Sequence, residues 1–444
     1  MSRSRLINAA LIVVASLLAA CSLLTPRPRS FNVSLSDVDG DGDVDAVVGN
    51  RPGNVETAGE PNSIWLNDGS GRFTDSDQQL VGSHGTNWDV THAVALGDLD
   101  GDGDTDTIFG NAFQSPSTVW LNDGAGQFEL HGEYQWKSVN DHDYSVSEAV
   151  ALGDLDLDGD LDAYVGYCCK SWWAASSENR IDAQGYSDAH NMVWLNDGGG
   201  RFTDSEQRLG NWSTGAVALG DLDGDGDLDA FEVNRGGRSE YDASDPSDRV
   251  WFNDGTGHFT DSGQSLDDSD GYAVAVGDLD LDGDLDAFVG NDDRGTSGQT
   301  NKVWLNDGSG HFTDSGQNLG NAHTRVVALT DVEGDGDLDA FVDNDTAGQI
   351  WRNDGTGRFL DSGQRLSHAD GTVVTVGDVD GDGDADVFAT HYDRGYQVWY
   401  NDGTGHLSKD NNWGIMPICL VGSGGIALGL GLFGWRFSRF RCKL

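Results

Sequence analysis

The 444-residue chain is poor in cysteine, proline and positive charge. Of its five cysteines only the adjacent pair Cys168 and Cys169 lies away from the ends, and neighbouring cysteines seldom form an unstrained bridge, so no disulfide framework is expected. Only 26 Lys and Arg face 75 Asp and Glu, a net charge of −49. This excludes nucleic acid as a partner, because phosphate binding needs a basic surface. Strong net charge often means disorder, but 14 Trp, 17 Phe and 37% hydrophobic residues argue against it.

The N-terminus predicts an export signal. Arg3 and Arg5 precede an apolar run over residues 6–20, the pattern of a signal peptide. The run closes on Leu-Ala-Ala-Cys, which resembles a bacterial lipobox and implies lipidation of Cys21. An ordinary signal peptide with a nearby cysteine is the alternative. We expect a signal peptide over 1–21, and residues 22–30 serve as a linker.

The C-terminal segment 411–444 contains a second apolar run, Ile415–Trp435, followed by a basic tail. Its length suits one membrane-spanning helix, and the tail suits a cytoplasmic end. A sorting signal that is cleaved after export has the same pattern. Under both interpretations the chain is exported and held at the cell surface or outer envelope, with its body facing outward.

A repeat organises everything between these ends. The segment DVDGDGDVD begins at Asp37, and six similar nonapeptides follow, with 47 to 67 residues from one start to the next. A second motif of the type VWLNDGSGHF follows each of them. Each unit predicts four strands, with the acidic loop between the first two and a glycine turn between the last two. Seven such units predict an all-β fold, a seven-bladed β-propeller of four-stranded antiparallel blades over 31–410. A linear array of small domains is less favoured, because a single blade cannot bury both its faces.

The acidic loops predict metal sites. Carboxylates at positions 1, 3, 5 and 9 with glycine at position 6 match the front of an EF-hand loop, and position 7 offers a backbone carbonyl. Oxygen-only ligands favour Ca²⁺, up to seven ions, which would relieve repulsion between crowded carboxylates. A solvated acidic turn that binds nothing is the alternative. The candidate ligands, loop by loop in the order of positions 1, 3, 5, 7 and 9, are Asp37, Asp39, Asp41, Asp43 and Asp45; Asp98, Asp100, Asp102, Asp104 and Asp106; Asp154, Asp156, Asp158, Asp160 and Asp162; Asp221, Asp223, Asp225, Asp227 and Asp229; Asp278, Asp280, Asp282, Asp284 and Asp286; Asp331, Glu333, Asp335, Asp337 and Asp339; and Asp378, Asp380, Asp382, Asp384 and Asp386. Because Glu333 is one methylene longer than aspartate, we expect its loop to bind more weakly.

These loops and the count of seven resemble the FG-GAP repeats of integrin α-subunit propellers and the bacterial VCBS-type repeats. The resemblance implies a seven-bladed propeller, calcium between the first two strands of a blade, and a role in adhesion. The chain departs from the name motif, since AFVGN and TIFGN stand where Phe-Gly and Gly-Ala-Pro are expected. The ligand preference of integrins therefore does not carry over.

Tryptophan divides into two groups. Seven occupy one position of the predicted third strand, which favours packing between blades over a sugar-stacking surface. Others lie in connections of variable length, and we expect these connections on the face opposite the acidic loops. Trp172 and Trp173 in the longest insertion, with Trp136 in another, are candidate ligand-binding anchors, although the insertions could instead only cover the blades.

Together these features predict a monomeric calcium-binding propeller at the cell surface that mediates adhesion or binds a protein or glycan. The eleven histidines are scattered without a nucleophile–base constellation, so we expect no catalysis. A structural protein of envelope assembly, or a secreted enzyme acting on polysaccharides, are the alternatives.

Overall fold

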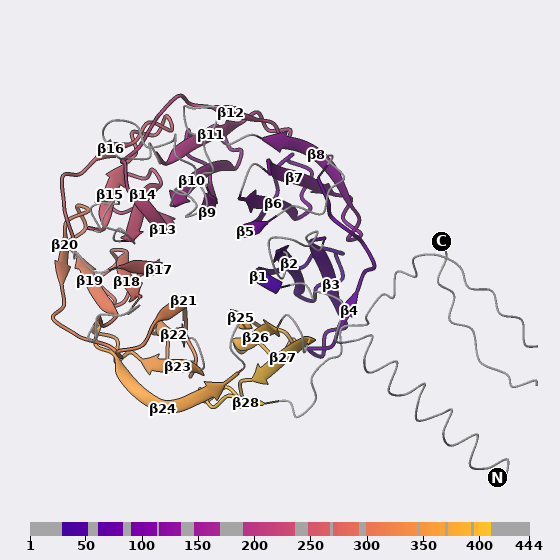
Figure 1. Cartoon of the computed structure of the whole chain (residues 1–444). Helices are drawn as coiled ribbons and strands as arrows, with labels where there is room; N and C mark the ends of the chain where they lie inside the picture. Colours follow the sequence, from indigo (N-terminus) through magenta and orange to yellow (C-terminus); the bar gives the residue numbers. More distant parts are fainter. Residues whose placement is uncertain are drawn as a thin grey trace, which may run out of the picture.

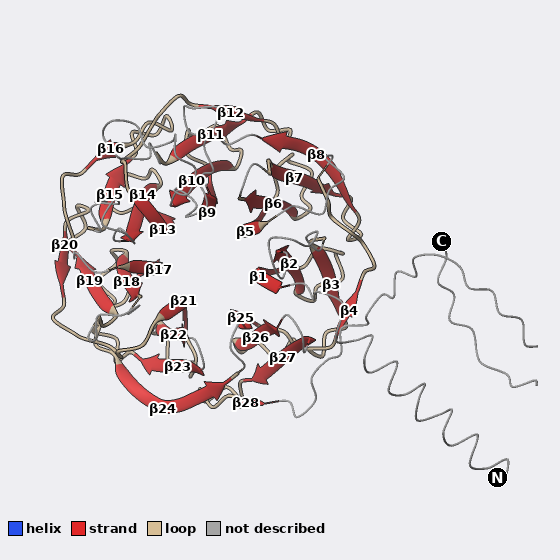
Figure 2. Ribbon diagram, in the orientation of Figure 1, coloured by secondary structure: helices blue, strands red, loops and turns tan. Residues whose placement is uncertain are grey.

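The computed structural model describes residues 29–51, 61–82, 90–112, 115–134, 146–168, 190–235, 247–266, 270–292, 299–344, 347–368, 372–391 and 395–409. These residues form seven four-stranded antiparallel sheets, arranged as blades around a central axis (Figure 1, Figure 2). In every blade the strands follow chain order from the axis to the rim. The predicted all-β, seven-bladed propeller is confirmed.

The innermost strands are β1 (Arg29–Ser36), β5 (Thr91–Gly97), β9 (Val146–Gly153), β13 (Ser213–Gly220), β17 (Gly271–Gly277), β21 (Thr324–Thr330) and β25 (Thr372–Gly377). The second strands are β2 (Asp45–Arg51), β6 (Asp106–Asn111), β10 (Asp162–Cys168), β14 (Asp229–Arg235), β18 (Asp286–Asn291), β22 (Asp339–Asn344) and β26 (Asp386–His391). The third strands are β3 (Ser63–Asn67), β7 (Ser117–Asn122), β11 (Met192–Asn196), β15 (Arg249–Phe252), β19 (Lys302–Asn306), β23 (Ala347–Arg352) and β27 (Gly395–Tyr400). The outermost strands are β4 (Phe73–Asp75), β8 (Phe128–Tyr134), β12 (Phe202–Asp204), β16 (Thr260–Asp261), β20 (Phe312–Asp314), β24 (Leu360–Ser367) and β28 (Ser408–Lys409).

The second strands lie at the centre of each blade. β10, β14 and β18 are buried at every residue, because the sheet of each blade packs against a neighbouring blade on both sides. Short apolar runs without alternation, such as DAFVGN, are typical of strands buried on both faces.

The repeated tryptophan of the third strand belongs to the core. Its seven copies are between 3% and 9% exposed. Trp65 pairs across the sheet with Ala46, and Trp251 pairs with Ala230. A small residue opposite the indole leaves room for the ring to lie over the sheet. The prediction that these residues pack between blades is confirmed.

An asparagine at the end of each third strand joins neighbouring blades. Asn122 Nδ2 donates to the Val38 carbonyl in the acidic loop of the preceding blade at 2.7 Å, and the same bond recurs at all seven junctions at 2.7–2.9 Å. Asn67 donates to Val379, which closes the ring between the last blade and the first. Each blade consists of four strands that are consecutive in the chain. Among the described strands, none of the last blade therefore belongs to the sheet of the first blade, and none of the first belongs to the sheet of the last.

A glutamine clasp forms a second connection at five junctions. Gln78 Nε2 donates to the Gly126 carbonyl of the next blade, and its Oε1 accepts from Phe128 N at 2.9 Å. The same pair of bonds is made by Gln207, Gln264, Gln317 and Gln364. At the other two junctions a tyrosine hydroxyl accepts the corresponding amide, from Tyr134 and from Tyr396.

Candidate metal centres

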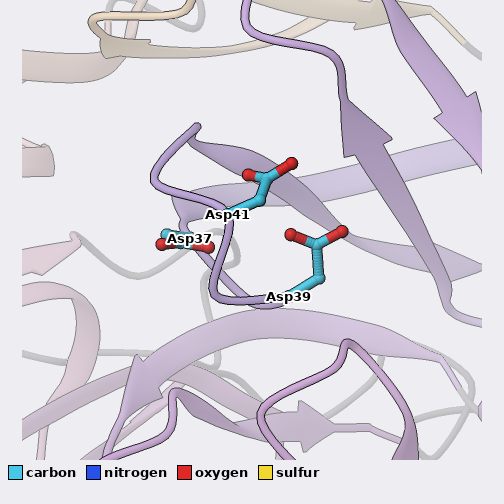
Figure 3. A group of neighbouring side chains, drawn as sticks. All are labelled: Asp37, Asp39 and Asp41. Carbon is cyan, nitrogen blue, oxygen red and sulfur yellow. The ribbon is translucent and has the colours of Figure 1, made fainter.

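Each acidic loop connects the first and second strands of a blade. The glycine turns between third and fourth strands lie at the same end of the sheet, since the strands form an antiparallel meander. Figure 3 shows the first loop, where the carboxylates of Asp37, Asp39 and Asp41 surround a common space. One oxygen from each of these three lies within 4.8 Å of the others.

Glycine gives the loop its tight curvature. Gly40 and Gly42 have φ values of 76° and 96°, in the left-handed region that disfavours other residues. Their amides donate to the two oxygens of Asp37 at 2.8 and 3.0 Å. The turn thereby fixes the position-1 carboxylate before any ion binds.

Equivalent carboxylate groups form in other loops. They comprise Asp98, Asp100 and Asp106; Asp154, Asp156 and Asp162; Asp221, Asp223 and Asp225; and Asp278, Asp280 and Asp282. In each of these five groups the structure brings residues of positions 1 and 3 together, joined by position 5 in three of them and by position 9 in two.

The position-3 carboxylates provide a test of whether a cation fits. Asp39, Asp280 and Asp380 each keep one buried oxygen, Oδ1, with no hydrogen-bond partner among the described residues. Burial raises the pKa of Asp39, and the neighbouring Asp41 carboxylate raises it further. Buried oxygens without a donor are costly unless a cation pairs with them. Carboxylate ligands of this kind suit a hard cation such as Ca²⁺.

The position-9 aspartate has a second task. Asp45 is fully buried, and its two oxygens accept the Val38 and Asn67 amides at 3.0 and 2.7 Å. The same two bonds occur in every loop. Burial raises the pKa of six of these carboxyls to about 6, namely Asp45, Asp106, Asp162, Asp229, Asp286 and Asp386. Position 9 thus ties the loop to the third strand whether or not it also contacts an ion.

The position-7 side chain points elsewhere. The Asp43 carboxylate lies against Gly69 of the glycine turn, where a Cβ atom would sit 2.5 Å from Asp43 Oδ2. None of the five carboxylate groups described above includes a position-7 residue. This arrangement agrees with a contribution through the backbone carbonyl alone.

Two loops carry leucine in place of glycine at position 4. Leu157 and Leu281 have φ values of 61° and 60°, and their side chains are 57% and 56% exposed. An exposed apolar side chain in a left-handed conformation gains little from packing, so strain remains in these loops.

Several predicted features lie outside the described residues. These are Cys21, Cys169, the three candidate anchors Trp136, Trp172 and Trp173, and both terminal apolar runs. Within the described ranges, no helix is long and apolar enough to cross a membrane.

Cys168 ends β10 in a polar cluster that the sequence analysis did not anticipate. Its thiol lies 3.5 Å from Glu148 Oε2, and Glu148 forms an ion pair with Arg235 at 2.8 Å and a hydrogen bond with His92 Nδ1 at 2.9 Å. The Arg235 guanidinium also covers the Tyr272 ring at 4.0 Å. These residues belong to four different blades, and no local sequence pattern identifies them.

Sequence reasoning also missed the asparagine and glutamine connections between blades. Both residues recur in every or nearly every repeat, within the motifs WLND and DSGQ, so the signal was their repetition at fixed distances from the loops.

Comparisons with known proteins agree with this architecture. No curated protein matches the chain. A solved lectin of Agrocybe aegerita, described for recognition of non-reducing terminal N-acetylglucosamine, is 19% identical, with a TM-score of 0.50 over 86% of this chain and 89% of its own. The BBS1N chain solved in complex with ARL6DN is 10% identical, with a TM-score of 0.51 over 82% and 89%. A protein from Lactobacillus plantarum is 15% identical, with a TM-score of 0.51 over 77% and 86%. At these identities the likeness concerns the fold alone.

The family comparison reaches further. The chain matches the FG-GAP-like repeat over residues 37–109, 98–165, 180–231, 278–342 and 331–389. These matches include the acidic loop with the strands on either side of it, and together they span more than half of the chain. The protein therefore belongs to the family of FG-GAP-like repeat proteins.

Proposed function

We propose that this protein is a calcium-stabilised propeller that binds a protein or glycan ligand at the cell surface and mediates adhesion without catalysis. The observation that carries the calcium part is the set of clustered carboxylates with buried oxygens that lack a donor. Ca²⁺ accepts six to eight oxygen ligands in flexible geometry, which suits carboxylates joined by a backbone carbonyl and water.

The ion would be held mainly by positions 1, 3 and 5, with the position-7 carbonyl and position 9 beside them. In the first loop these are Asp37, Asp39, Asp41, Asp43 and Asp45. A bound cation offsets the repulsion between carboxylates and keeps the loop in one conformation. Because Val38 of the same loop accepts Asn122 from the next blade, a rigid loop also stabilises the junction between blades.

The ligand part rests on the scaffold. In each blade the second strand ends and the third begins at the end opposite the acidic loops, so we place the connections of variable length there. Binding residues tend to lie on such connections. Trp172 and Trp173 in the longest insertion, with Trp136 in another, are our candidate anchors. The Agrocybe lectin of similar fold binds a sugar, which makes glycans the first ligand class to screen.

The terminal segments support export and attachment at the envelope, through a lipid on Cys21, a C-terminal helix, or both. We propose that the chain acts as a monomer there.

The experiment is a binding screen of the full-length chain against glycan and envelope-protein arrays at millimolar Ca²⁺. Truncating an anchor typically weakens binding by about thirtyfold or more, so the W172A/W173A variant should lose the ligand and keep its melting temperature. The matched control is D98N/D102N, which should bind normally at saturating Ca²⁺. If the tryptophan variant binds as well as the wild type, the proposed ligand face is wrong.

A further inference from the structure

In the sixth blade, one residue of the acidic loop and one residue of the third strand differ in type from their counterparts in the other six blades, and these two residues contact each other. Position 3 carries Glu333 in place of aspartate, and the third strand of the same blade carries Arg352. The other blades have an apolar or aromatic residue at the position of Arg352, namely Leu66, Leu121, Leu195, Phe252, Leu305 and Tyr400.

The arginine lies against this loop. Arg352 Nη1 is 3.2 Å from Glu333 Oε1, and Arg352 Nη2 donates to the Thr404 carbonyl of the next blade at 3.0 Å. Glu333 is only 16% exposed, so water screens the pair incompletely. The guanidinium therefore bridges the sixth loop and the seventh blade.

The equivalent space in other blades is filled by an uncharged side chain. Leu305 of the fifth blade and the β-carbon of Asp280 both lie beside Gly357, just as Arg352 and Glu333 lie beside Gly405. The arginine thus occupies a site that is apolar elsewhere. It places its positive charge beside the position-3 carboxylate, pairing with Glu333 Oε1, while Glu333 Oε2 is buried without a hydrogen-bond partner among the described residues.

A guanidinium is always charged, and a divalent ion in the same loop would be repelled by it at short range. We infer that Arg352 serves as the built-in cation of the sixth loop, so the chain binds six calcium ions and leaves this loop free of metal. The junction of the last two blades is then held by an ion pair and a backbone hydrogen bond that do not depend on calcium. This inference rests on the proposed calcium binding.

The remaining carboxylates of the loop are retained. Asp331 still accepts the amides of Gly334 and Gly336 at 2.7 and 2.9 Å, and Asp339 still accepts the amides of Val332 and Asn353 at 3.1 and 2.8 Å. Removing the guanidinium alone should therefore create a seventh cation site.

The test is the number of calcium ions bound per chain, measured by equilibrium dialysis and elemental analysis of the full-length protein. We expect six for the wild type and seven for R352L. R352Q, which retains part of the side chain without its charge, should also bind seven and serves if R352L does not fold. The matched control is R365L, which removes an exposed arginine paired with Asp361 on the same blade and should leave six.

Seven ions on the wild type, six on both Arg352 variants, or seven on R365L would overturn the inference while leaving calcium binding intact. No calcium on the wild type would overturn the proposed function, and this inference with it.

Discussion

Two carboxylates of the second loop should differ in how calcium changes the effect of their substitution. Asp106 at position 9 is fully buried and accepts the Leu99 and Asn122 amides at 2.8 and 2.7 Å. Within the described ranges, Asp100 at position 3 accepts a single amide, from Asp102 at 3.3 Å. The first residue therefore supports the fold directly, and we expect the second to support it mainly through the proposed calcium ion.

The magnitudes follow from these bonds. In D106N the amide group offers one acceptor oxygen, so one buried backbone N–H faces an NH₂ group, at a cost of about 1–3 kcal/mol. D100N removes no strong bond and should stay within about 0.5 kcal/mol of the wild type in chelator. At 10 mM Ca²⁺, a site with a dissociation constant of about 0.1–1 mM adds about 1–3 kcal/mol by mass action, and D100N should lose this increment.

The assay is thermal unfolding followed by circular dichroism, for each variant in chelator and in 10 mM Ca²⁺. D106N should melt a few degrees lower than the wild type in both conditions, whereas D100N should melt lower only in calcium. If D106N melts normally in chelator, the buried amide bonds do not stabilise the loop as argued. If D100N is equally destabilised in both conditions, position 3 is not a calcium ligand.

Two further predictions concern pH and strain. In chelator, the free energy of unfolding should fall as pH rises from about 4 to 6. Asp45 and its counterparts have a pKa of about 6 in the folded chain, against 3.8 as the ordinary value, so the folded chain binds more protons in this window. A melting temperature that rises with pH would contradict this prediction. Replacing Leu157 by glycine should stabilise the chain by up to about 1 kcal/mol, because glycine adopts φ 61° without strain. The converse G101L variant in the second loop should destabilise the chain. Unchanged melting temperatures of both variants would show that a positive φ at this position carries no energetic cost.

The repeat made much of the fold predictable. The blade count, the four strands per blade and the position of the acidic loops all follow from two motifs that alternate seven times, and the structure places them as expected. The third-strand tryptophan could be assigned to the core because one position recurs with the same residue. Local signals of this kind can be read from the sequence because a strand and its turn are formed by residues close in sequence.

Contacts between blades could not be predicted in the same way. Asn122 and Val38 are 84 residues apart, and Arg235 and Glu148 lie on β14 and β9 of different blades. Which side chains meet across a junction depends on how the blades are oriented about the axis, and one sequence does not specify that angle. The contact of Arg352 with Glu333 was missed for a related reason, because one residue lies in the acidic loop and the other on the third strand, and both are departures from the repeat.

Two hydrogen bonds explain how each acidic loop connects neighbouring blades of the ring. Val38, between the position-1 and position-3 aspartates, accepts the Asn122 side chain of the next blade, and Asp45 of the same loop accepts the Asn67 amide of its own blade. Each loop therefore joins the third strands of two blades through its own backbone and its position-9 carboxylate. Repulsion between the position-1, 3 and 5 carboxylates acts against this arrangement, and a cation in the loop reverses the sign of that effect. The charge compensation that we propose for the loops, by calcium or by Arg352, would therefore act on the same seven junctions that hold the ring closed.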